Sequence, residues 1–199
     1  MIGGVVLAAG EGRRFGGAKL AAELDGRPLL DHALEAMLTV PGIERVVVVL
    51  GAHAEELARR ADLAGVETAL CEDWREGISA SLRAGVRTLA EAEALVVTLA
   101  DQPFITPQVI AAIVDRIEGR APAARATYAG RPGHPVLIKR QLFAAVEELR
   151  GDAGARDLLA AAGVRSVECG HLCPPDDVDT QDDLEAARRL LAVEVEAGR

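Results

Sequence analysis

The sequence predicts an α/β fold of three layers (α/β/α), with helices on both faces of a mostly parallel, twisted sheet. Apolar runs of strand length alternate along the chain with amphipathic stretches at helical spacing. This alternation is typical of parallel sheets, because a helix packed on the sheet makes the crossover between parallel strands. The 199 residues suit one domain, and 50% of them are hydrophobic, so the chain can bury a sizeable core.

The predicted elements follow each other in a regular order. Apolar runs predict buried strands over residues 3–8, 45–50, 66–71, 94–100 and 164–169. Each of the first four is followed by a stretch that predicts a helix, over residues 30–38, 54–61, 79–89 and 107–117. Later segments predict strands over 124–128 and 135–138 and helices over 141–149, about 153–161 and 181–193. We expect a single domain over residues 1–199, with a hairpin-like insertion around 121–138.

The charge and the cysteine content narrow the class of protein. A formal net charge of −9 disfavours nucleic acid and anionic membrane surfaces as partners. No run of about 18 apolar residues predicts a membrane helix, and the N-terminus lacks the pattern of a signal peptide. Three cysteines, an odd number, do not indicate a disulfide framework. We therefore expect a cytoplasmic protein whose partners are small molecules.

The first predicted strand runs directly into a glycine-rich loop, in the segment VVLAAGEGRRFGGAKL of residues 5–20. Glycines let a ligand approach the backbone, whose N–H groups can then form an anion-binding concavity. Three cations lie within seven residues of this otherwise acidic chain: Arg13, Arg14 and Lys19. A polyphosphate is the natural counterpart of such a loop. The alternative is an ordinary strand-to-helix turn with solvated basic side chains.

Two familiar phosphate-binding loops fit this segment badly. A Walker loop requires Lys followed by Ser or Thr, whereas Lys19 is followed by Leu20. The spacing GEGRRFG is one residue too long for the dinucleotide fingerprint, which also requires an acid at the end of the second strand. That strand ends in VVVVLGAH, without an acid. The pattern therefore disfavours an oxidoreductase that depends on a dinucleotide.

Asp101 ends the apolar run in ALVVTLADQP, at the predicted carboxyl end of a strand. Ligands of open parallel sheets bind outside the carboxyl ends of the strands, so this aspartate and the glycine-rich loop are expected at one site. The alternative is a turn-forming role for Asp101 before Pro103.

A resemblance to a known family extends along nearly the whole chain. LAAGEGRRFGGAKL resembles the signature of nucleotidyltransferases similar to the molybdenum cofactor guanylyl- and cytidylyltransferases. Five later segments resemble the cytidylyltransferase branch in the same order, although Gln181 stands where that family usually has Pro: EDWREGISASLRAG, VVTLADQPFITP, GRPGHPVLI, LRGDAGARDLL and DVDTQDDL. The resemblance implies a Rossmann-like fold of the nucleotide-diphospho-sugar transferase type. It also implies transfer of CMP from CTP to a phosphorylated acceptor, molybdopterin, with release of pyrophosphate.

The resemblance assigns catalytic roles to three residues. Arg14 and Lys19 match the arginine and the lysine of the family loop, and they are expected at the phosphates, where charge grows as pyrophosphate departs. Mg²⁺ would bridge the two reacting anions, with Asp101 as its first ligand. Asp177 and Asp179 are the candidates for a second carboxylate. Their alternative role is local, since Asp179 or Thr180 can cap the helix that follows.

The resemblance also bears on the base, because Ala9 and the stretch REGISASL both look like the cytidylyl type. A methyl group at Ala9, where guanylyl members usually carry Gly, would narrow the base pocket, and polar groups at Glu76, Ser79 and Ser81 would recognise the pyrimidine edge. The alternative for Arg13 is a side chain that only contacts solvent, and the alternative for Ser79 is the N-cap of the helix that follows. The candidate nucleotide-binding residues are Leu7, Ala8, Ala9, Gly10, Gly12, Arg13, Gly16, Glu76, Gly77, Ser79 and Ser81.

The acceptor is the least determined part of this hypothesis. His134, in a rigid Gly-His-Pro turn, and Arg156, near a helix start, are the candidates to bind it, and both also have structural alternatives. A molybdoenzyme or its chaperone would be a possible macromolecular partner. Two alternatives remain open: a nucleotidyltransferase of the same fold with another base or acceptor, and an NAD(P)H-dependent oxidoreductase of the nicotine-blue type.

Overall fold

The structure is a computed structural model, and it describes residues 1–152 and 154–197. A central sheet has seven strands in the order β5-β4-β1-β6-β8-β7-β9. Their bounds are β1 Ile2–Ala8, β4 Ile43–Leu50, β5 Glu67–Leu70, β6 Ala94–Leu99, β7 Ala123–Tyr128, β8 Arg131–Lys139 and β9 Arg165–Glu168. Strand β8 runs antiparallel to both of its neighbours, and the other neighbouring strands are parallel. The predicted mostly parallel sheet is confirmed.

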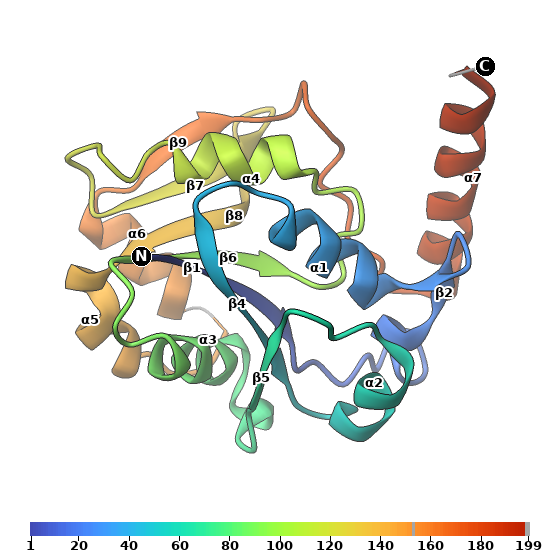
Figure 1. The fold of residues 1–199 in the computed structure, drawn as a ribbon, viewed down its shortest axis with the longest axis horizontal. Coiled ribbons are helices and arrows are strands. Elements are labelled where there is room, and N and C mark those ends of the chain that lie inside the picture. Colours follow the sequence, from blue (N-terminus) through green and yellow to red (C-terminus); the bar gives the residue numbers. More distant parts are fainter. Residues whose placement is uncertain (153, 198–199) are drawn as a thin grey trace.

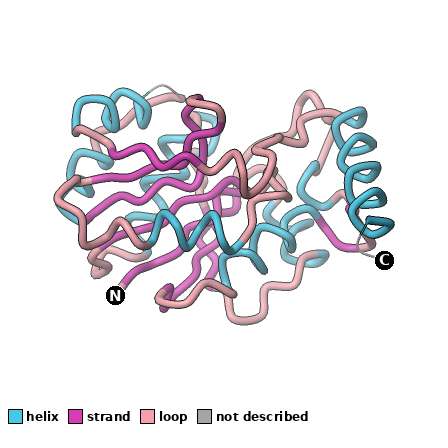
Figure 2. The backbone as a smooth tube through the Cα atoms, turned by 90° about the horizontal axis from the view of Figure 1, so that it is seen from above, coloured by secondary structure: helices cyan, strands magenta, loops and turns pink. Residues whose placement is uncertain are grey.

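Helices cover both faces of this sheet, as Figures 1 and 2 show. One face carries α1 (Leu29–Leu38), α2 (Ala54–Arg60) and α4 (Pro107–Val114), and the other carries α3 (Ile78–Thr88), α5 (Phe143–Glu147) and α6 (Gly154–Ala162). Successive side chains of a strand point to opposite faces. Val6 therefore packs under α1 and α4, whereas Val5 and Leu7 pack under α3. Because both faces are covered, the central strands are mostly apolar, as buried parallel strands are, with Thr98 a buried polar residue in β6.

The segment around residues 121–138 forms the hairpin β7–β8 inside the sheet, between β6 and β9. Its strands pair with the rest of the sheet through backbone hydrogen bonds, so it continues the sheet instead of projecting from it.

Helix α7 (Gln181–Ala197) stands at one edge of the molecule (Figures 1 and 2). It packs on a second, two-stranded sheet of β2 (Glu23–Leu24) and β3 (Arg27–Pro28), which the apolar pattern does not predict. The turn between these strands is Asp25-Gly26, and both residues have positive φ (52° and 74°), a typical hairpin turn. Within the residues described, none of the helices is both long and apolar enough to cross a membrane.

Candidate active site

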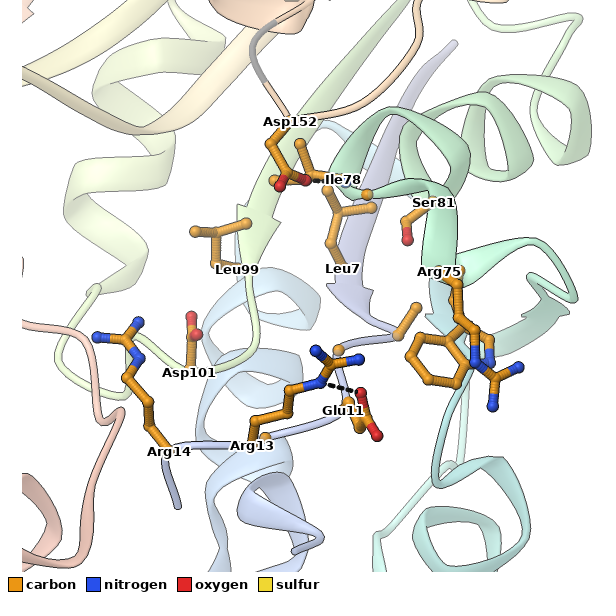
Figure 3. A pocket seen from close by; sticks show the side chains of 15 residues that line it. Leu7, Glu11, Arg13, Arg14, Arg75, Ile78, Ser81, Leu99, Asp101 and Asp152 are labelled. Atoms are coloured by element: carbon orange, nitrogen blue, oxygen red, sulfur yellow. Dashed lines mark hydrogen bonds and ion pairs between the residues drawn. The ribbon is translucent and has the colours of Figure 1, made fainter. Parts of the chain in front are cut away.

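The carboxyl ends of β1 and β6 open onto a cavity of about 620 Å³, a size suited to a small-molecule ligand. Figure 3 shows Arg13, Arg14 and Asp101 at one end of it and Ile78, Ser81 and Asp152 at the other. Its wall consists of Leu7, Ala9, Gly10, Glu11, Gly12, Arg13, Arg14, Trp74, Arg75, Gly77, Ile78, Ser81, Leu99, Asp101 and Asp152.

The glycine-rich loop after β1 turns sharply at Gly12, which has a φ of +68°. A Cβ at this position would lie 2.3 Å from the carbonyl oxygen of Gly17, so only glycine fits. The carbonyl oxygen of Gly12 accepts hydrogen bonds from the N–H groups of Phe15 and Gly16, both at 3.0 Å. The loop is therefore a compact turn, with the side chains of Arg13 and Arg14 on its outer side.

The segment that follows β4 is hydrogen-bonded to the glycine-rich loop. The N–H of Ala52 donates to the carbonyl oxygen of Ala9 at 3.2 Å, and Nε2 of His53 lies 2.9 Å from the carbonyl oxygen of Glu11. A dinucleotide-binding fold needs an acid at the end of this strand to bind a ribose. Here the same position supports the loop instead.

Lys19 lies at the centre of a charged cluster. Its Nζ is 2.8 Å from Oδ2 of Asp101 and 2.8 Å from Oδ1 of Asp179, and its side chain is only 12% exposed. The second oxygen of Asp179 accepts a hydrogen bond from Arg14 at 2.6 Å. Burial alone would lower the pKa of Lys19, but the two carboxylates outweigh it and raise the pKa above 10.5. The lysine is therefore a cation shared by two carboxylates.

The same carboxylates offer a suitable set of ligands for a divalent metal. Asp101 and Asp179 are close enough to share one cation, as Lys19 demonstrates. Oδ1 of Asp101 is buried and has no hydrogen-bond partner among the described residues. Carboxylate oxygens are the hard donors that Mg²⁺ and Mn²⁺ prefer. The described residues contain no ready-made group of three His, Cys, Asp or Glu metal ligands, so further donors would have to come from a ligand.

Asp177 belongs to the same region but has a different partner. Its Oδ1 accepts a hydrogen bond from Nε2 of Gln102 at 2.6 Å. Desolvation raises the pKa of Asp177, Gln102 opposes this, and the negative charges of Asp101 and Asp179 raise the pKa further. Asp177 therefore extends the negatively charged edge of the site beyond the pair that contacts Lys19.

The start of α7 is capped without the side chain of Asp179. Oδ2 of Asp183 accepts hydrogen bonds from the N–H groups of Asp179 (3.0 Å) and Thr180 (2.8 Å), and the hydroxyl of Thr180 accepts one from the N–H of Asp183 (3.2 Å). This reciprocal arrangement is a capping box. The capping alternative for Asp179 is thereby excluded, since its carboxylate contacts Arg14 and Lys19 instead.

Most of the predicted nucleotide-binding residues lie in the cavity wall, but four do not. Leu7, Ala9, Gly10, Gly12, Arg13, Gly77 and Ser81 line it, whereas Ala8, Gly16, Glu76 and Ser79 do not. Glu76 accepts a hydrogen bond from Arg83 at 2.6 Å, and Arg83 also donates to the carbonyl oxygen of Leu149. The structure therefore gives Glu76 a partner inside the protein.

The N-cap alternative for Ser79 is wrong, because α3 begins at Ile78 and Ser79 is fully buried in its first turn. The cap comes from a distant loop: Oδ1 of Asp152 accepts from the N–H of Ile78 at 2.9 Å, and the carbonyl oxygen of Gly151 accepts from the N–H of Ser79 at 3.3 Å.

The cavity wall includes six residues that the sequence hypothesis omits: Glu11, Trp74, Arg75, Ile78, Leu99 and Asp152. The guanidinium of Arg75 stacks 4.2 Å from the ring centre of Trp74. Trp74 has a signal in the sequence, as the single tryptophan of a chain with few aromatics. Asp152 stands in the LRGDAGARDLL segment, but nothing in that segment indicates its place in this wall, because it reaches the wall from 74 residues beyond Ile78.

The two predicted acceptor-binding residues lie outside this cavity wall. Arg156 is exposed on α6. His134 is half-buried, and desolvation lowers its pKa to about 4, with the charge of Asp101 acting in the opposite direction. A second cavity of about 580 Å³ begins at the residue after Asp101, since Gln102 lines it together with Asp177, Tyr128 and Arg131.

A three-layer α/β fold with a glycine-rich loop after its first strand, and with cations and carboxylates at the same sheet edge, defines a nucleotide-binding protein of the transferase type. The model of the MobA-like NTP transferase domain matches residues 4–167, and the chain belongs to this family.

Proteins similar along their whole length carry different names. Nicotine blue oxidoreductase of Paenarthrobacter nicotinovorans is 35% identical over 198 residues, covering 94% of this chain and 95% of the relative. The purine catabolism protein PucB of Bacillus subtilis is 31% identical over 211 residues, covering 95% and 97%. The crystal structure of Rv0371c from Mycobacterium tuberculosis has a TM-score of 0.83 at 31% identity, covering 94% and 97%. Rv0371c has also been solved in complex with manganese, with a TM-score of 0.80, 28% identity and the same coverage.

Proposed function

We propose that this protein transfers CMP from CTP to a phosphorylated acceptor, most simply molybdopterin, with release of pyrophosphate and with Mg²⁺ as cofactor. The observation that carries the proposal is the pairing of Lys19 with Asp101 and Asp179 beside the glycine-rich loop. This cluster contains both the cation that a triphosphate needs and the carboxylates that a divalent metal needs.

The shape of the cavity supports one orientation of the nucleotide. Arg13 and Arg14 are at one end, where the triphosphate would be attracted, and the opposite end has the apolar walls that a base requires. Ala9 lines the cavity, and its methyl group packs so closely against Gly51 that a Cβ on that glycine would lie 2.7 Å from it. The preference for a pyrimidine is inferred from Ala9 itself, which stands where guanylyl members of the family usually carry Gly.

The reaction requires positioning and charge stabilisation more than covalent chemistry. A phosphate oxygen of the acceptor forms a bond to the α-phosphorus of CTP, and the bond from that phosphorus to the bridging oxygen breaks. The electron pair leaves with pyrophosphate. Lys19 and Arg14, which pair with the carboxylates here, would neutralise the charge that develops on this leaving group.

Asp101 and Asp179 are the residues that would hold the divalent cation, with Asp177 beside them. The cation, when bound, supplies charge neutralisation between the two phosphate groups. Lys19 would then exchange its carboxylate partners for phosphate oxygens. The manganese complex of Rv0371c supports a divalent metal in this family.

The acceptor is proposed to occupy the second cavity. Arg131 is an exposed cation in its wall, and Gln102 and Asp177 connect it to the carboxylate cluster. His134 is not in this wall but follows Gly133, which is, and its imidazole would be neutral at neutral pH, since its pKa is lowered to about 4. A molybdoenzyme or its chaperone would take the product.

A panel of nucleoside triphosphates, each mixed with molybdopterin and Mg²⁺, tests this function through the release of pyrophosphate. We expect release with CTP in excess of that with GTP, ATP or UTP, and none from the Asp101→Asn variant, which keeps the size of the side chain. Asp115→Asn, at the exposed end of α4, is the matched control and should behave as wild type. Equal release from all nucleotides, or undiminished turnover by Asp101→Asn, would contradict the proposal.

A second function has support from one relative. The 35% identity to nicotine blue oxidoreductase extends over 94% of this chain, so an NAD(P)H-dependent reduction remains the second candidate. The loop one residue too long for a dinucleotide fingerprint, and the absence of an acid after β4 in VVVVLGAH, favour the transferase. Oxidation of NADPH by the purified protein with a quinoid dye, without pyrophosphate release from CTP, would decide for the oxidoreductase.

A further inference from the structure

Among the residues that the structure describes, Asp152 is the one member of the nucleotide cavity wall that follows Asp101 in the chain. It follows α5, and its Oδ1 accepts the hydrogen bond from the N–H of Ile78 at 2.9 Å. The carbonyl oxygen of Gly151 accepts from the N–H of Ser79 at 3.3 Å. The carboxylate is therefore held at the start of α3, in the cavity wall opposite Arg13 (Figure 3).

The backbone at Gly77, opposite the carboxylate of Asp152, leaves space for that carboxylate. Gly77 has a φ of +106°, and a Cβ at this position would lie 2.3 Å from Oδ1 of Asp152. Any other residue at Gly77 would displace the carboxylate or the loop. The glycine and the aspartate thus form a fitted pair in the cavity wall.

One oxygen of Asp152 remains available to a ligand. The bond from Ile78 is the only hydrogen bond to this carboxylate from the residues that the structure describes, and the side chain is exposed toward the cavity. A carboxylate accepts hydrogen bonds and has no proton to donate in its ionised form. This end of the cavity therefore attracts a donor group.

The proposed orientation of the nucleotide brings the base to this end. The cations of the glycine-rich loop mark the phosphate end, and Leu7, Ile78 and Leu99 form apolar walls toward the opposite end. A planar base that lies between these side chains directs its polar edge toward Asp152.

We propose that Asp152 recognises the exocyclic amino group of the base, and that it is the residue that selects CTP over UTP. This inference rests on the proposed function. Cytosine has an amino donor where uracil has a carbonyl acceptor, so the free oxygen of Asp152 pairs with the first and repels the second. A site built to hydrogen-bond a substrate group discriminates against the analogue that lacks it, because its own polar group is left unpaired.

The substitution Asp152→Asn tests this role with little change of shape. The N–H of Ile78 selects the amide oxygen as its acceptor, so the amide NH₂ takes the place of the free carboxylate oxygen. We expect wild type to bind CTP at least about tenfold more tightly than UTP, and the variant to lose or reverse that preference. Quenching of the fluorescence of Trp74 measures both affinities, because this single tryptophan lies in the cavity wall.

If the variant folds poorly, a change in the nucleotide tests the same role with the wild-type protein. A CTP analogue whose base lacks the amino group should bind wild type at least about tenfold more weakly than CTP. Asp115→Asn is the matched control and should keep the wild-type ratio. Binding of CTP to Asp152→Asn with an unchanged preference over UTP, or equal binding of CTP and the analogue, would overturn the role of Asp152 while leaving the proposed function intact. Failure of wild type to bind any of these nucleotides would contradict both.

Discussion

Nζ of Lys19 lies 2.8 Å from Oδ2 of Asp101, although 82 residues separate the two in the chain. Lys19 follows the glycine-rich loop after β1, and Asp101 follows β6, the strand that pairs with β1. The parallel pairing thus brings a phosphate-binding loop and a carboxylate to one edge. With Asp179 and Arg14, the cluster contains two carboxylates and two cations, while Oδ1 of Asp101 has no hydrogen-bond partner among the described residues.

Removal of a cation from this cluster should slow the departure of pyrophosphate more than it weakens ground-state binding. Lys19→Ala and Arg14→Ala are each expected to lower the rate of pyrophosphate formation by about 10²- to 10³-fold, because their charge matters most where negative charge develops. The dissociation constant of CMP, which has no leaving group, should change less. Arg13→Ala is the matched control with a smaller effect, since Arg13 is 80% exposed and pairs with Glu11. Equal losses in CMP binding and in rate would argue against this role.

Binding of the divalent metal should depend on the nucleotide. Lys19 already occupies the space between Asp101 and Asp179 as their shared cation, so we expect the nucleotide-free protein to bind Mn²⁺ weakly and CTP to strengthen the binding. Lys19→Met removes the cation that Asp101 and Asp179 share, although Arg14 still pairs with Asp179, and it should raise the Mn²⁺ affinity of the nucleotide-free protein at least about tenfold. The intensity of the electron paramagnetic resonance signal of free Mn²⁺ measures this. Mn²⁺ affinities that are the same with and without CTP, and the same in wild type and Lys19→Met, would show that Lys19 does not compete with the metal for the carboxylates.

The stability of the wall of the nucleotide cavity depends on a buried arginine behind it. Arg83 is 7% exposed, donates to Glu76 and to the carbonyl oxygen of Leu149, and so joins α3 to the end of α5. Arg83→Met should lower the free energy of unfolding by about 1.5–3 kcal/mol and the melting temperature by about 3–12 °C. Arg87→Met on the same helix, with an exposed pair to Glu147, should cost at most about 1 kcal/mol. Thermal unfolding that does not distinguish the two variants would refute this account of Arg83.

His134 should make the stability depend on pH. Its folded-state pKa of about 4 lies below the ordinary 6.5, so between these values the unfolded state binds a proton that the folded state does not. Stability is therefore fully present above about pH 6.5 and decreases as the pH falls toward 4, by about 2 kcal/mol at about pH 5. Urea unfolding of His134→Gln should show a flatter pH dependence, whereas a substitution of the exposed His171 by Gln should not. The same change of the free energy of unfolding with pH in wild type and His134→Gln would contradict the expectation.

The elements of the fold could be predicted because their signals are local. The apolar run ALVVTL predicts β6, and the pattern after Thr106 predicts α4, whose first turn begins with Pro107 and is capped by that threonine. The pair β2–β3 escapes the apolar pattern because each strand has two residues, although the Asp25-Gly26 turn that joins them has a recognisable signature.

The candidate site could be predicted where each residue has its own motif, and not where a distant residue decides its role. Asp101 and Lys19 stand in recognisable motifs, but their direct contact is a property of the sheet. Ser79 has the composition of an N-cap, yet Asp152 supplies the cap from 74 residues beyond Ile78. Thr180 and Asp183 form the cap of α7 locally, and this frees Asp179 for a contact 160 residues away in the chain.

The fate of the two phosphorus labels of CTP tests the central claim most directly. CTP labelled at the α-phosphorus, and in a parallel reaction at the γ-phosphorus, is incubated with molybdopterin, Mg²⁺ and the protein. We predict that the α-label appears in a cytidylylated pterin, that the γ-label appears in pyrophosphate, and that neither transfer occurs with Asp101→Asn. Both labels remaining in CTP, while the protein oxidises NADPH, would contradict the account.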